Sequence, residues 1–182
     1  MTHATEAILQ NCTAQCRIAS PLGTMLLART EAGLAGAWFE MQKHHPAEID
    51  APERADDPLL AQAACQLREY FAGERDEFDL PLDLQGTEFQ RAVWRALLRI
   101  APGTTSSYGA IARELGLPSA SRAVGAAVGR NPVSIIVPCH RVLGSSGALT
   151  GYAGGLDRKT SLLRIEAERV GPRRGARQVE IH

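Results

Sequence analysis

Glycine and proline breakers recur through residues 87–130, and they restrict this part of the chain to short helices joined at sharp corners. Thr87 followed by Gln90 is a capping-box pattern, which predicts a helix start. Apolar residues then recur on one helical face from Phe89 to Ile100, before "APG" ends the pattern. We therefore expect a first helix over about 87–100 that buries one side.

Two shorter helices are predicted next. Ser107 is a suitable N-cap for "SYGAIAREL", Gly116 ends that helix, and "LPSASRAVGAAVGR" follows at once. A short helix, a tight turn and a second short helix with an arginine predict a helix-turn-helix. The second of these helices is rich in alanine and glycine. Such small residues fit either tight packing against another helix or close approach to a DNA backbone.

The first half of the chain shows short strands broken by turns. "PLG" and "EAG" divide residues 14–40, which predicts a small antiparallel meander. Residues 58–73 then show an apolar helical face that ends at Gly73, a predicted C-cap. These patterns predict an α+β fold with an N-terminal domain over 1–85, a C-terminal domain over 86–172 and a loose tail over 173–182.

The charges follow a similar division. Residues 1–100 carry 9 Lys/Arg and 15 Asp/Glu, a net charge of −6, whereas residues 101–165 carry 7 and 2, a net charge of +5. A basic half joined to an acidic half predicts a surface for a polyanion on the basic half only. Modest charge clustering is also common in proteins that bind no nucleic acid, so the charge alone leaves both interpretations open.

The composition fits an ordinary globular protein, with 45% hydrophobic and 22% charged residues. No apolar run approaches the roughly 20 residues that a membrane span needs. The N-terminal stretch has an acidic residue and no basic one before its short apolar patch, unlike a signal peptide. We therefore expect a cytoplasmic protein with no membrane partner.

The four cysteines are too few to form a disulfide framework in a chain of 182 residues. Cys12 and Cys16 lie four apart with His3 nearby, a spacing that leaves a zinc site conceivable. No second ligand pair with clear spacing follows. We therefore predict no metal and no cofactor.

The segment "SIIVPCHRVLG", residues 134–144, places a thiol, an imidazole and a guanidinium after an apolar run. A cysteine nucleophile reacts as the thiolate, so a base must lie within reach. His140 is adjacent to Cys139, but adjacent side chains on a strand point to opposite faces. The two can cooperate only if the chain bends after Pro138 or a water bridges them. Glu166, on a predicted helix with apolar neighbours, is the candidate carboxylate to hold the base, because a buried carboxylate needs a partner. The alternative is a buried, inert thiol.

"PCHRV" resembles the active-site signature of the O6-alkylguanine-DNA alkyltransferases, also called methylated-DNA–protein-cysteine methyltransferases. "GTEFQRAVWRAL", "SYGAIA", "SRAVGAAVGRNP" and "GYAGGLDRK" resemble further segments of that family, in the same order and at similar spacing. These motifs cover about residues 86–167, and the N-terminal half resembles the family more loosely through "SPLG" and "YFAGE". The resemblance implies an RNase H-like N-terminal domain and a C-terminal winged helix-turn-helix-like domain.

The resemblance also implies roles for single residues. Cys139 would accept the alkyl group from O6 of guanine, His140 would take the thiol proton through a water, and Glu166 would hold His140. Arg122 would enter the duplex where the target nucleotide leaves, and Tyr108 would contact the guanine ring nitrogen and the adjacent phosphate. The other predicted DNA contacts are Ser121, Ala123, Gly125 and Ala126.

The implied substrate pocket consists of Val128, Asn131, Pro138, Val142, Tyr152 and Ala153. Asn131 would brace the turn between recognition helix and active-site strand, and the Val142 carbonyl would receive the guanine amino group. Tyr152 and Ala153 would lie on a loop that closes over the base. The family often has serine where this chain has Ala153, and alanine can substitute if the backbone N–H makes the contact.

The resemblance implies direct, irreversible and stoichiometric repair of O6-alkylguanine, and of O4-alkylthymine, in duplex DNA. The helix would enter the minor groove and the damaged nucleotide would flip out. We expect a monomer that can cluster along DNA. Three alternatives are a noncatalytic lesion-binding relative, a regulator switched by cysteine methylation and a DNA-binding module with an inert thiol. The cysteine argues against the first, and the chain length leaves no room for the additional domain of the second.

Overall fold

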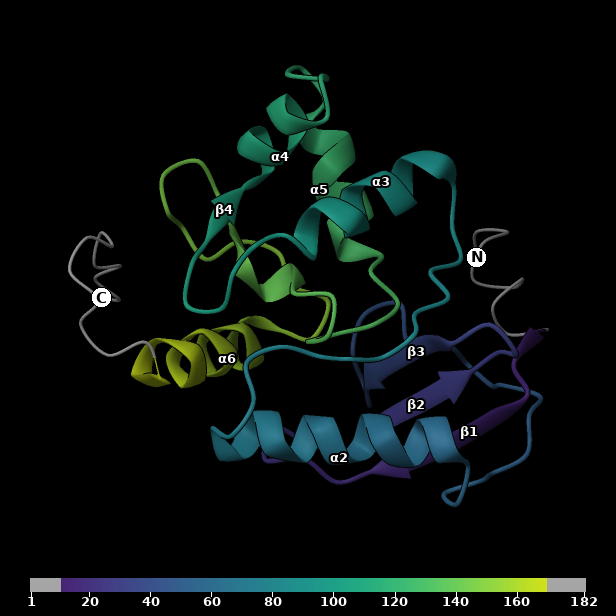
Figure 1. The fold of residues 1–182 in the computed structure, drawn as a ribbon. Coiled ribbons are helices and arrows are strands. Elements are labelled where there is room, and N and C mark those ends of the chain that lie inside the picture. The colour runs from purple at the N-terminus through teal and green to yellow at the C-terminus, as the bar shows by residue number, and fades with distance from the viewer. Residues whose placement is uncertain (1–10, 170–182) are drawn as a thin grey trace.

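The computed structural model describes residues 11–169, and its N-terminal part is a three-stranded antiparallel sheet (Figure 1). The strands are β1 (Ala14–Ile18), β2 (Met25–Arg29) and β3 (Leu34–Phe39), in the order β1-β2-β3. Met25 pairs with Ile18 on one side and with Phe39 on the other. The predicted meander is therefore confirmed. The predicted tail over 173–182 and His3 lie outside the described residues.

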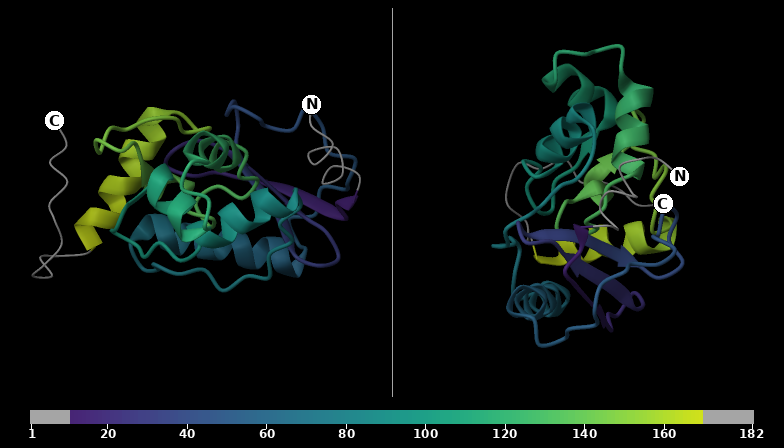
Figure 2. Two further views of the ribbon diagram at one scale, coloured as in Figure 1. Left: turned by 90° about the horizontal axis from the view of Figure 1, so that it is seen from above. Right: turned by 90° about the vertical axis from the view of Figure 1, so that its right-hand side faces the viewer.

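Helix α2 (Pro58–Ala72) packs against one face of this sheet. Asp57 caps its N-terminus by accepting from the backbone N–H groups of Leu59 and Leu60, and Gly73 ends it with φ of 82°. The Gly73 C-cap predicted from the sequence is thus confirmed. In both Figures 1 and 2 the sheet lies between α2 and the helices within residues 88–129.

The free edge of β3 joins the two halves of the chain. The Leu34 N–H donates to the Pro81 carbonyl of the connecting segment, and the Asp83 N–H donates to the Leu34 carbonyl. Further along the strand, Ala37 accepts from the Ser134 N–H at 2.8 Å and donates to the Pro132 carbonyl at 2.9 Å. The segment that leads into the thiol motif is therefore anchored to the sheet.

The helical unit comprises α3 (Glu88–Leu97), α4 (Tyr108–Glu114) and α5 (Ser121–Gly129). The Thr87–Gln90 capping box is present at the start of α3, and Ser107 caps α4 through the Ala110 N–H, as predicted. The Trp94 indole N–H of α3 donates to the Ala127 carbonyl of α5 at 2.8 Å. The helix-turn-helix predicted for α4 and α5 is present, and α3 braces its second helix.

A 3-10 turn, η1 (Cys139–Arg141), and the last described helix, α6 (Leu156–Arg169), complete the fold. The short strand β5 (Val142–Leu143) leaves η1 and pairs in parallel with β4 (Ser106–Ser107), directly before α4. One core cluster includes apolar residues from the sheet, α2, the helical unit and the thiol segment. The α+β fold class is confirmed, and among residues 11–169 no helix is long and apolar enough to cross a membrane.

Candidate active site

The centre of the site is the buried carboxylate of Glu166, which is 1% exposed. Its Oε1 accepts from His140 Nε2 at 2.7 Å, Tyr70 Oη at 2.8 Å and Arg141 Nη2 at 2.8 Å. Its Oε2 accepts from Arg141 Nε at 2.9 Å and from the Gly103 N–H at 3.3 Å. We call these five residues the carboxylate cluster. The structure brings His140 and Glu166 together, as the sequence predicted.

Cys139 and His140 lie within η1, directly after Pro138. The sequence left open a strand, on which the two side chains would point apart, or a bend. The structure has the bend, because the chain enters a 3-10 turn at Cys139. Strand pairing begins directly after this turn, at β5.

Asn131 connects the end of α5 to the thiol. Its Nδ2 donates to the Val137 carbonyl at 2.8 Å and to Cys139 Sγ at 3.0 Å, while its Oδ1 accepts from the Val133 N–H at 3.0 Å. All of these groups are buried. One side chain therefore fixes the loop between α5 and η1 and also contacts the sulfur.

Burial dominates the protonation of the thiol and the imidazole. Burial raises the pKa of the Cys139 thiol to about 11, against smaller lowering effects from the Asn131 hydrogen bond and the positive charge of Lys159. Burial also lowers the pKa of His140, although the Glu166 carboxylate opposes this. In the free protein we therefore expect a neutral thiol beside a neutral imidazole at neutral pH.

The hydrogen bonds assign the tautomer of His140. Burial raises the pKa of the Glu166 carboxyl, but the hydrogen bonds from His140 and Arg141 and the charge of Arg141 outweigh burial and hold that pKa well below its ordinary value, so Glu166 is ionised. An ionised carboxylate only accepts, so His140 Nε2 carries the proton. The opposite nitrogen, Nδ1, is buried and has no hydrogen-bond partner among the described residues. Nδ1 is therefore the nitrogen available to act as a base.

Three further buried residues of the site were not predicted from the sequence. Arg141 and Tyr70 belong to the carboxylate cluster, and Arg141 is a neighbour of His140 within the motif itself. Lys159 of α6 is fully buried, and its Nζ donates to the carbonyls of Val142 at 2.6 Å and Thr150 at 2.8 Å. Burial lowers the pKa of Lys159 to about 8. The sequence offered a signal only for Arg141, through its position in "PCHRV".

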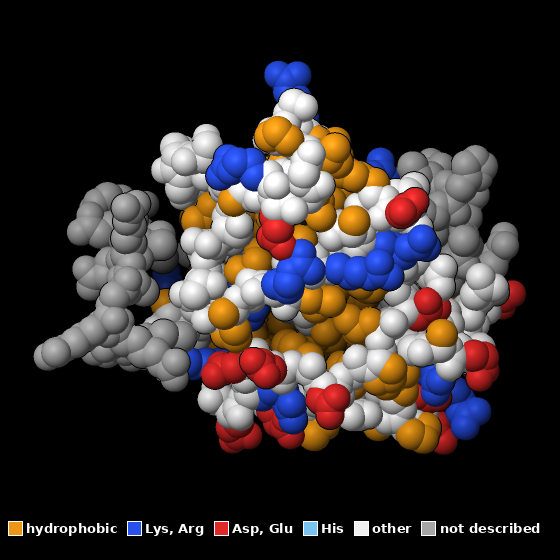
Figure 3. All heavy atoms as spheres, turned by 45° about the horizontal axis from the view of Figure 1, so that its top comes forward, with side chains coloured by type: hydrophobic (Ala, Val, Ile, Leu, Met, Phe, Trp, Pro, Cys, Tyr) orange, Lys and Arg blue, Asp and Glu red, His pale blue; other side chains and the backbone are white. Residues whose placement is uncertain are grey.

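The residues predicted to contact DNA lie on α5 and at the start of α4. Arg122, Ala123 and Ala126 are exposed on α5, and Ser121 and Gly125 are partly buried. The Tyr108 ring lies against Gly125, since a methyl group there would stand 3.7 Å from Tyr108 Cδ1. In Figure 3 basic side chains form a row across the helical unit, and most acidic side chains lie on the other side of an apolar hollow. The structure thus places the predicted DNA contacts together.

The predicted pocket residues come from several segments of the second half. Val128, Asn131 and Pro138 are buried, and Pro138 directly precedes η1. Val142 begins β5, and its carbonyl accepts from Lys159. Tyr152 and Ala153 lie on the loop before α6, where the Tyr152 hydroxyl is buried and its ring lies against Gly154. Burial raises the pKa of the Tyr152 hydroxyl well above its ordinary value.

The same loop also contacts the helix-turn-helix. Tyr108 Oη donates to the Thr150 carbonyl at 3.2 Å, and it lies 3.4 Å from the Gly151 carbonyl. Lys159 Nζ donates to the same Thr150 carbonyl. The loop that the resemblance assigned to base contact is therefore tied to both α4 and α6.

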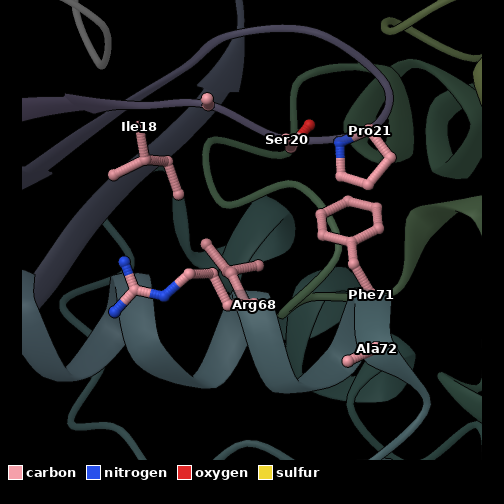
Figure 4. A pocket seen from close by; sticks show the side chains of 8 residues that line it. Ile18, Ser20, Pro21, Arg68, Phe71 and Ala72 are labelled. Carbon is pink, nitrogen blue, oxygen red and sulfur yellow. The ribbon is translucent and has the colours of Figure 1, made fainter.

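Two other features of the molecule carry no comparable chemistry. Cys16 packs in the main core and Cys12 in a second cluster with Leu26 and Trp38, so the two thiols belong to separate clusters. Within residues 11–169, no group of three His, Cys, Asp or Glu side chains could hold a metal ion. A hollow of about 300 Å³ between the turn after β1 and α2 is lined by Ile18, Pro21 and Phe71 among others (Figure 4), and it includes no residue of the carboxylate cluster.

Comparison with known proteins identifies relatives along nearly the whole described chain. Residues 88–170 match the "6-O-methylguanine DNA methyltransferase, DNA binding domain" and residues 17–84 match the "6-O-methylguanine DNA methyltransferase, ribonuclease-like domain". The chain is 52% identical over 147 residues to a methylated-DNA–protein-cysteine methyltransferase of Mycolicibacterium paratuberculosis, with 81% of this chain and 88% of that protein covered. A protein of the same name from Methanosarcina acetivorans is 50% identical over 149 residues, and the match covers 81% of this chain and 94% of that protein.

A solved structure is also similar to this chain. The crystal structure of Mycobacterium tuberculosis OGT in complex with DNA is similar with a TM-score of 0.79 and 46% sequence identity. The match covers 88% of this chain and 96% of that one.

Proposed function

Because the chain belongs to the 6-O-methylguanine DNA methyltransferase family, we propose that Cys139 is the residue that accepts the alkyl group. The activity of the protein is direct DNA repair by alkyl transfer to a cysteine. The observation that carries the residue assignment is the buried Cys139–His140 turn, whose histidine is bound to Glu166 through Nε2 at 2.7 Å. His140 then acts as the base, and Glu166 holds its ring and tautomer.

The transfer starts from a protonated thiol. Since burial raises the pKa of Cys139 to about 11, the sulfur becomes an effective nucleophile only when its proton is removed. His140 Nδ1 takes this proton, directly or through a water. The sulfur then bonds to the alkyl carbon as the bond between that carbon and O6 of guanine breaks, and the electron pair stays on O6. Guanine is restored once it takes up a proton.

The charge on the developing imidazolium explains the Glu166 contact. When His140 accepts the thiol proton it becomes positive in a buried site, which is costly without a nearby anion. Glu166 is ionised and lies 2.7 Å from Nε2, so it stabilises that state. Arg141 balances the charge of Glu166 before the reaction, because its Nε and Nη2 bind both carboxylate oxygens.

Helix α5 is the element that binds DNA in this proposal. Its exposed Ala123 and Ala126 let the backbone approach closely, and Arg122 extends from the start of the helix. Cys139 is only 4% exposed, so a base stacked in a duplex cannot reach its sulfur. The damaged nucleotide therefore flips out, at a cost of a few kcal/mol that Arg122 offsets by filling the gap.

The Val142 carbonyl, Tyr152 and the Ala153 backbone hold the flipped base in this proposal. The Val142 carbonyl already accepts from Lys159, and its second lone pair is the one offered to the guanine amino group. Tyr108 contacts the guanine ring and the adjacent phosphate from the start of α4. No cofactor takes part, since the cysteine itself receives the alkyl group.

Two further assignments are also proposals. The domain division at residues 85 and 86 is supported by the connecting segment along β3, which ends where the capping box of α3 begins. A cytoplasmic location is supported by the free thiols of Cys16, Cys65 and Cys139, which fit a reducing compartment, and by DNA as the substrate.

Mass spectrometry after incubation with duplex DNA that carries one O6-methylguanine tests the proposal. We expect one methyl group per protein, located on Cys139 by peptide mapping, with no further gain after longer incubation. A Cys139→Ser variant should bind the same duplex and gain no methyl group. Methylation of Cys12, Cys16 or Cys65 in place of Cys139 would contradict the assignment.

A further inference from the structure

We propose that Tyr70, which α2 of the N-terminal half contributes, is a positioning residue for alkyl transfer. The inference rests on the proposed function of Cys139, His140 and Glu166, and it extends the site to a part of the chain outside the DNA-binding domain. Tyr70 falls within residues 17–84, which match the ribonuclease-like domain, whereas the other members of the carboxylate cluster fall within 88–170.

The hydroxyl of Tyr70 makes a direct bond to the site. Tyr70 is fully buried, and its Oη donates to Glu166 Oε1 at 2.8 Å. Burial and the negative charge of Glu166 raise the pKa of Tyr70 well above its ordinary value, so the hydroxyl keeps its proton and remains a donor. The same Oε1 accepts from His140 Nε2, so the tyrosine and the histidine share one acceptor atom.

The ring of Tyr70 is held from several sides. The Arg169 guanidinium lies 4.7 Å from the ring centroid, and the rings of Phe71 and Phe78 lie 5.5 Å and 5.6 Å away. Arg169 itself donates to the Arg75 carbonyl at 2.8 Å. These contacts hold the hydroxyl in place beside Oε1. A group that orients a carboxylate must itself be fixed in this way.

The shared oxygen gives Tyr70 a second effect, on the basicity of His140. A hydrogen bond from Tyr70 withdraws negative charge from Oε1, which weakens the stabilisation of a positive His140 by that oxygen. Without the hydroxyl, Oε1 attracts the His140 proton more strongly and the pKa of His140 rises. More of the imidazole is then protonated before the thiol proton arrives, and that fraction cannot act as a base.

Tyr70 is uncharged, unlike the other side chains that face His140. It can therefore be substituted without changing the net charge around His140 and Glu166. Arg141 and Lys159 are positively charged and lower the pKa of His140, while Glu166 raises it. Tyr70→Phe changes no charge, keeps the ring beneath Arg169 and removes one donor. Any change in the pH dependence of the reaction then reports on the hydrogen bond.

The test compares the parent protein with Tyr70→Phe in single-turnover methyl transfer to Cys139 over a range of pH. We expect the limiting rate at saturating DNA to fall about tenfold, part of the 10²–10⁴-fold that general-base catalysis contributes, because loss of the hydrogen bond that orients Glu166 outweighs the greater basicity of His140. The acidic limb of the rate profile should move to higher pH. The DNA concentration that gives half the limiting rate should not change, because α2 lies across the sheet from α5 (Figure 2).

A control variant separates positioning from simple stabilisation. Leu67→Val lies one turn before Tyr70 on the same helix, is fully buried and changes only an aliphatic side chain, which can form no hydrogen bond to Glu166. It should lower the unfolding temperature without moving the rate profile. An unchanged rate profile in Tyr70→Phe, or an equal shift in Leu67→Val, would overturn the inference. Failure of the parent protein to methylate Cys139 would instead overturn the proposed function.

Discussion

Replacing Glu166 with glutamine tests the centre of the site, because it removes one charge and keeps the shape of the side chain. The carboxylate accepts five hydrogen bonds, three on Oε1 and two on Oε2. A glutamine offers one oxygen acceptor and one NH₂ donor. Whichever way the amide turns, its donor group faces N–H or O–H donors that have lost their acceptor.

The expected magnitude follows from burial of the partners. Arg141 is 5% exposed and His140 and Tyr70 are fully buried, so none of them can turn to water. Removing one partner of a buried ion pair typically costs about 3–5 kcal/mol, because the remaining charge stays buried. We therefore expect Glu166→Gln to lower the free energy of unfolding by about that amount, a large share of the 5–15 kcal/mol typical of a domain.

The same change should slow alkyl transfer. With glutamine in place of Glu166, His140 loses the acceptor that fixes its tautomer and the anion that stabilises its charged form. The rate of methyl transfer to Cys139 should fall by about 10²–10⁴-fold, the range that a general base contributes. The assay is single-turnover transfer at saturating DNA, measured where denaturant unfolding shows the variant to be folded.

Glu168→Gln is the matched control, since Glu168 is exposed on the same helix. It should leave both stability and rate close to those of the parent protein. The reasoning is refuted if Glu166→Gln unfolds within about 1 kcal/mol of the parent, or if it transfers the methyl group at a similar rate. Unchanged stability would mean that the buried donors around Glu166 do not depend on its carboxylate. An unchanged rate would mean that His140 does not depend on it.

Four further predictions concern DNA binding and protonation. Arg122→Ala should weaken binding to duplex DNA and reduce the slope of log affinity against log salt by about one unit, whereas Arg122→Lys should keep the slope. Fluorescence anisotropy over a salt series measures both, and an unchanged slope would mean that Arg122 brings no positive charge to the duplex. Ala126→Leu, at an exposed site on α5, should reduce DNA affinity at least tenfold without changing the denaturation midpoint, because its bulk separates α5 from the groove. Asn131→Ala should lower the free energy of unfolding by about 1–3 kcal/mol, because it leaves buried backbone groups unpaired; denaturant unfolding measures this effect. It should also raise the pKa of Cys139 further, because it removes the hydrogen bond to Sγ; thiolate absorbance against pH measures that effect. The parent protein should lose stability as pH falls below 6.5, because burial lowers the pKa of His140 below that value and the unfolded chain binds the proton first. It should lose more stability below about 4.5, because the pKa of Glu166 is lowered in the folded protein and the unfolded chain again binds the proton first. A free energy of unfolding that stays constant across both pH ranges would contradict this.

Local patterns were sufficient to predict most of the secondary structure. The Thr87–Gln90 capping box, the Ser107 cap and the Gly73 C-cap are short-range arrangements, so the residues that make them lie within four positions of one another. The meander was equally readable, because its turns lie between strands that pair with their sequence neighbours. Each of these predictions needed no knowledge of how distant segments pack.

The site was predictable only in part, since its geometry depends on distant segments. Glu166 was a candidate because a carboxylate among Leu162 and Leu163 required a partner. The sequence "VPCHR" alone could not distinguish the η1 turn from a strand. The loop before this turn is held by the Asn131 side chain, which bonds to the Val137 carbonyl and the Val133 N–H, and these bonds depend on the fold of the loop. Tyr70 appeared in the sequence as one of several apolar residues on the face of α2, and nothing near it indicated a bond to Glu166.

The carboxylate cluster has a consequence for the order in which this protein folds. Tyr70 is separated from Glu166 by 96 positions, Gly103 by 63 and His140 by 26. Contacts between residues so far apart in sequence form late, because long loops must close first. During synthesis, α6 leaves the ribosome after the sheet, the helical unit and the thiol turn. Cys139 is therefore made before its base can be held by Glu166, and the complete relay arises only when the last described helix docks onto the rest of the chain.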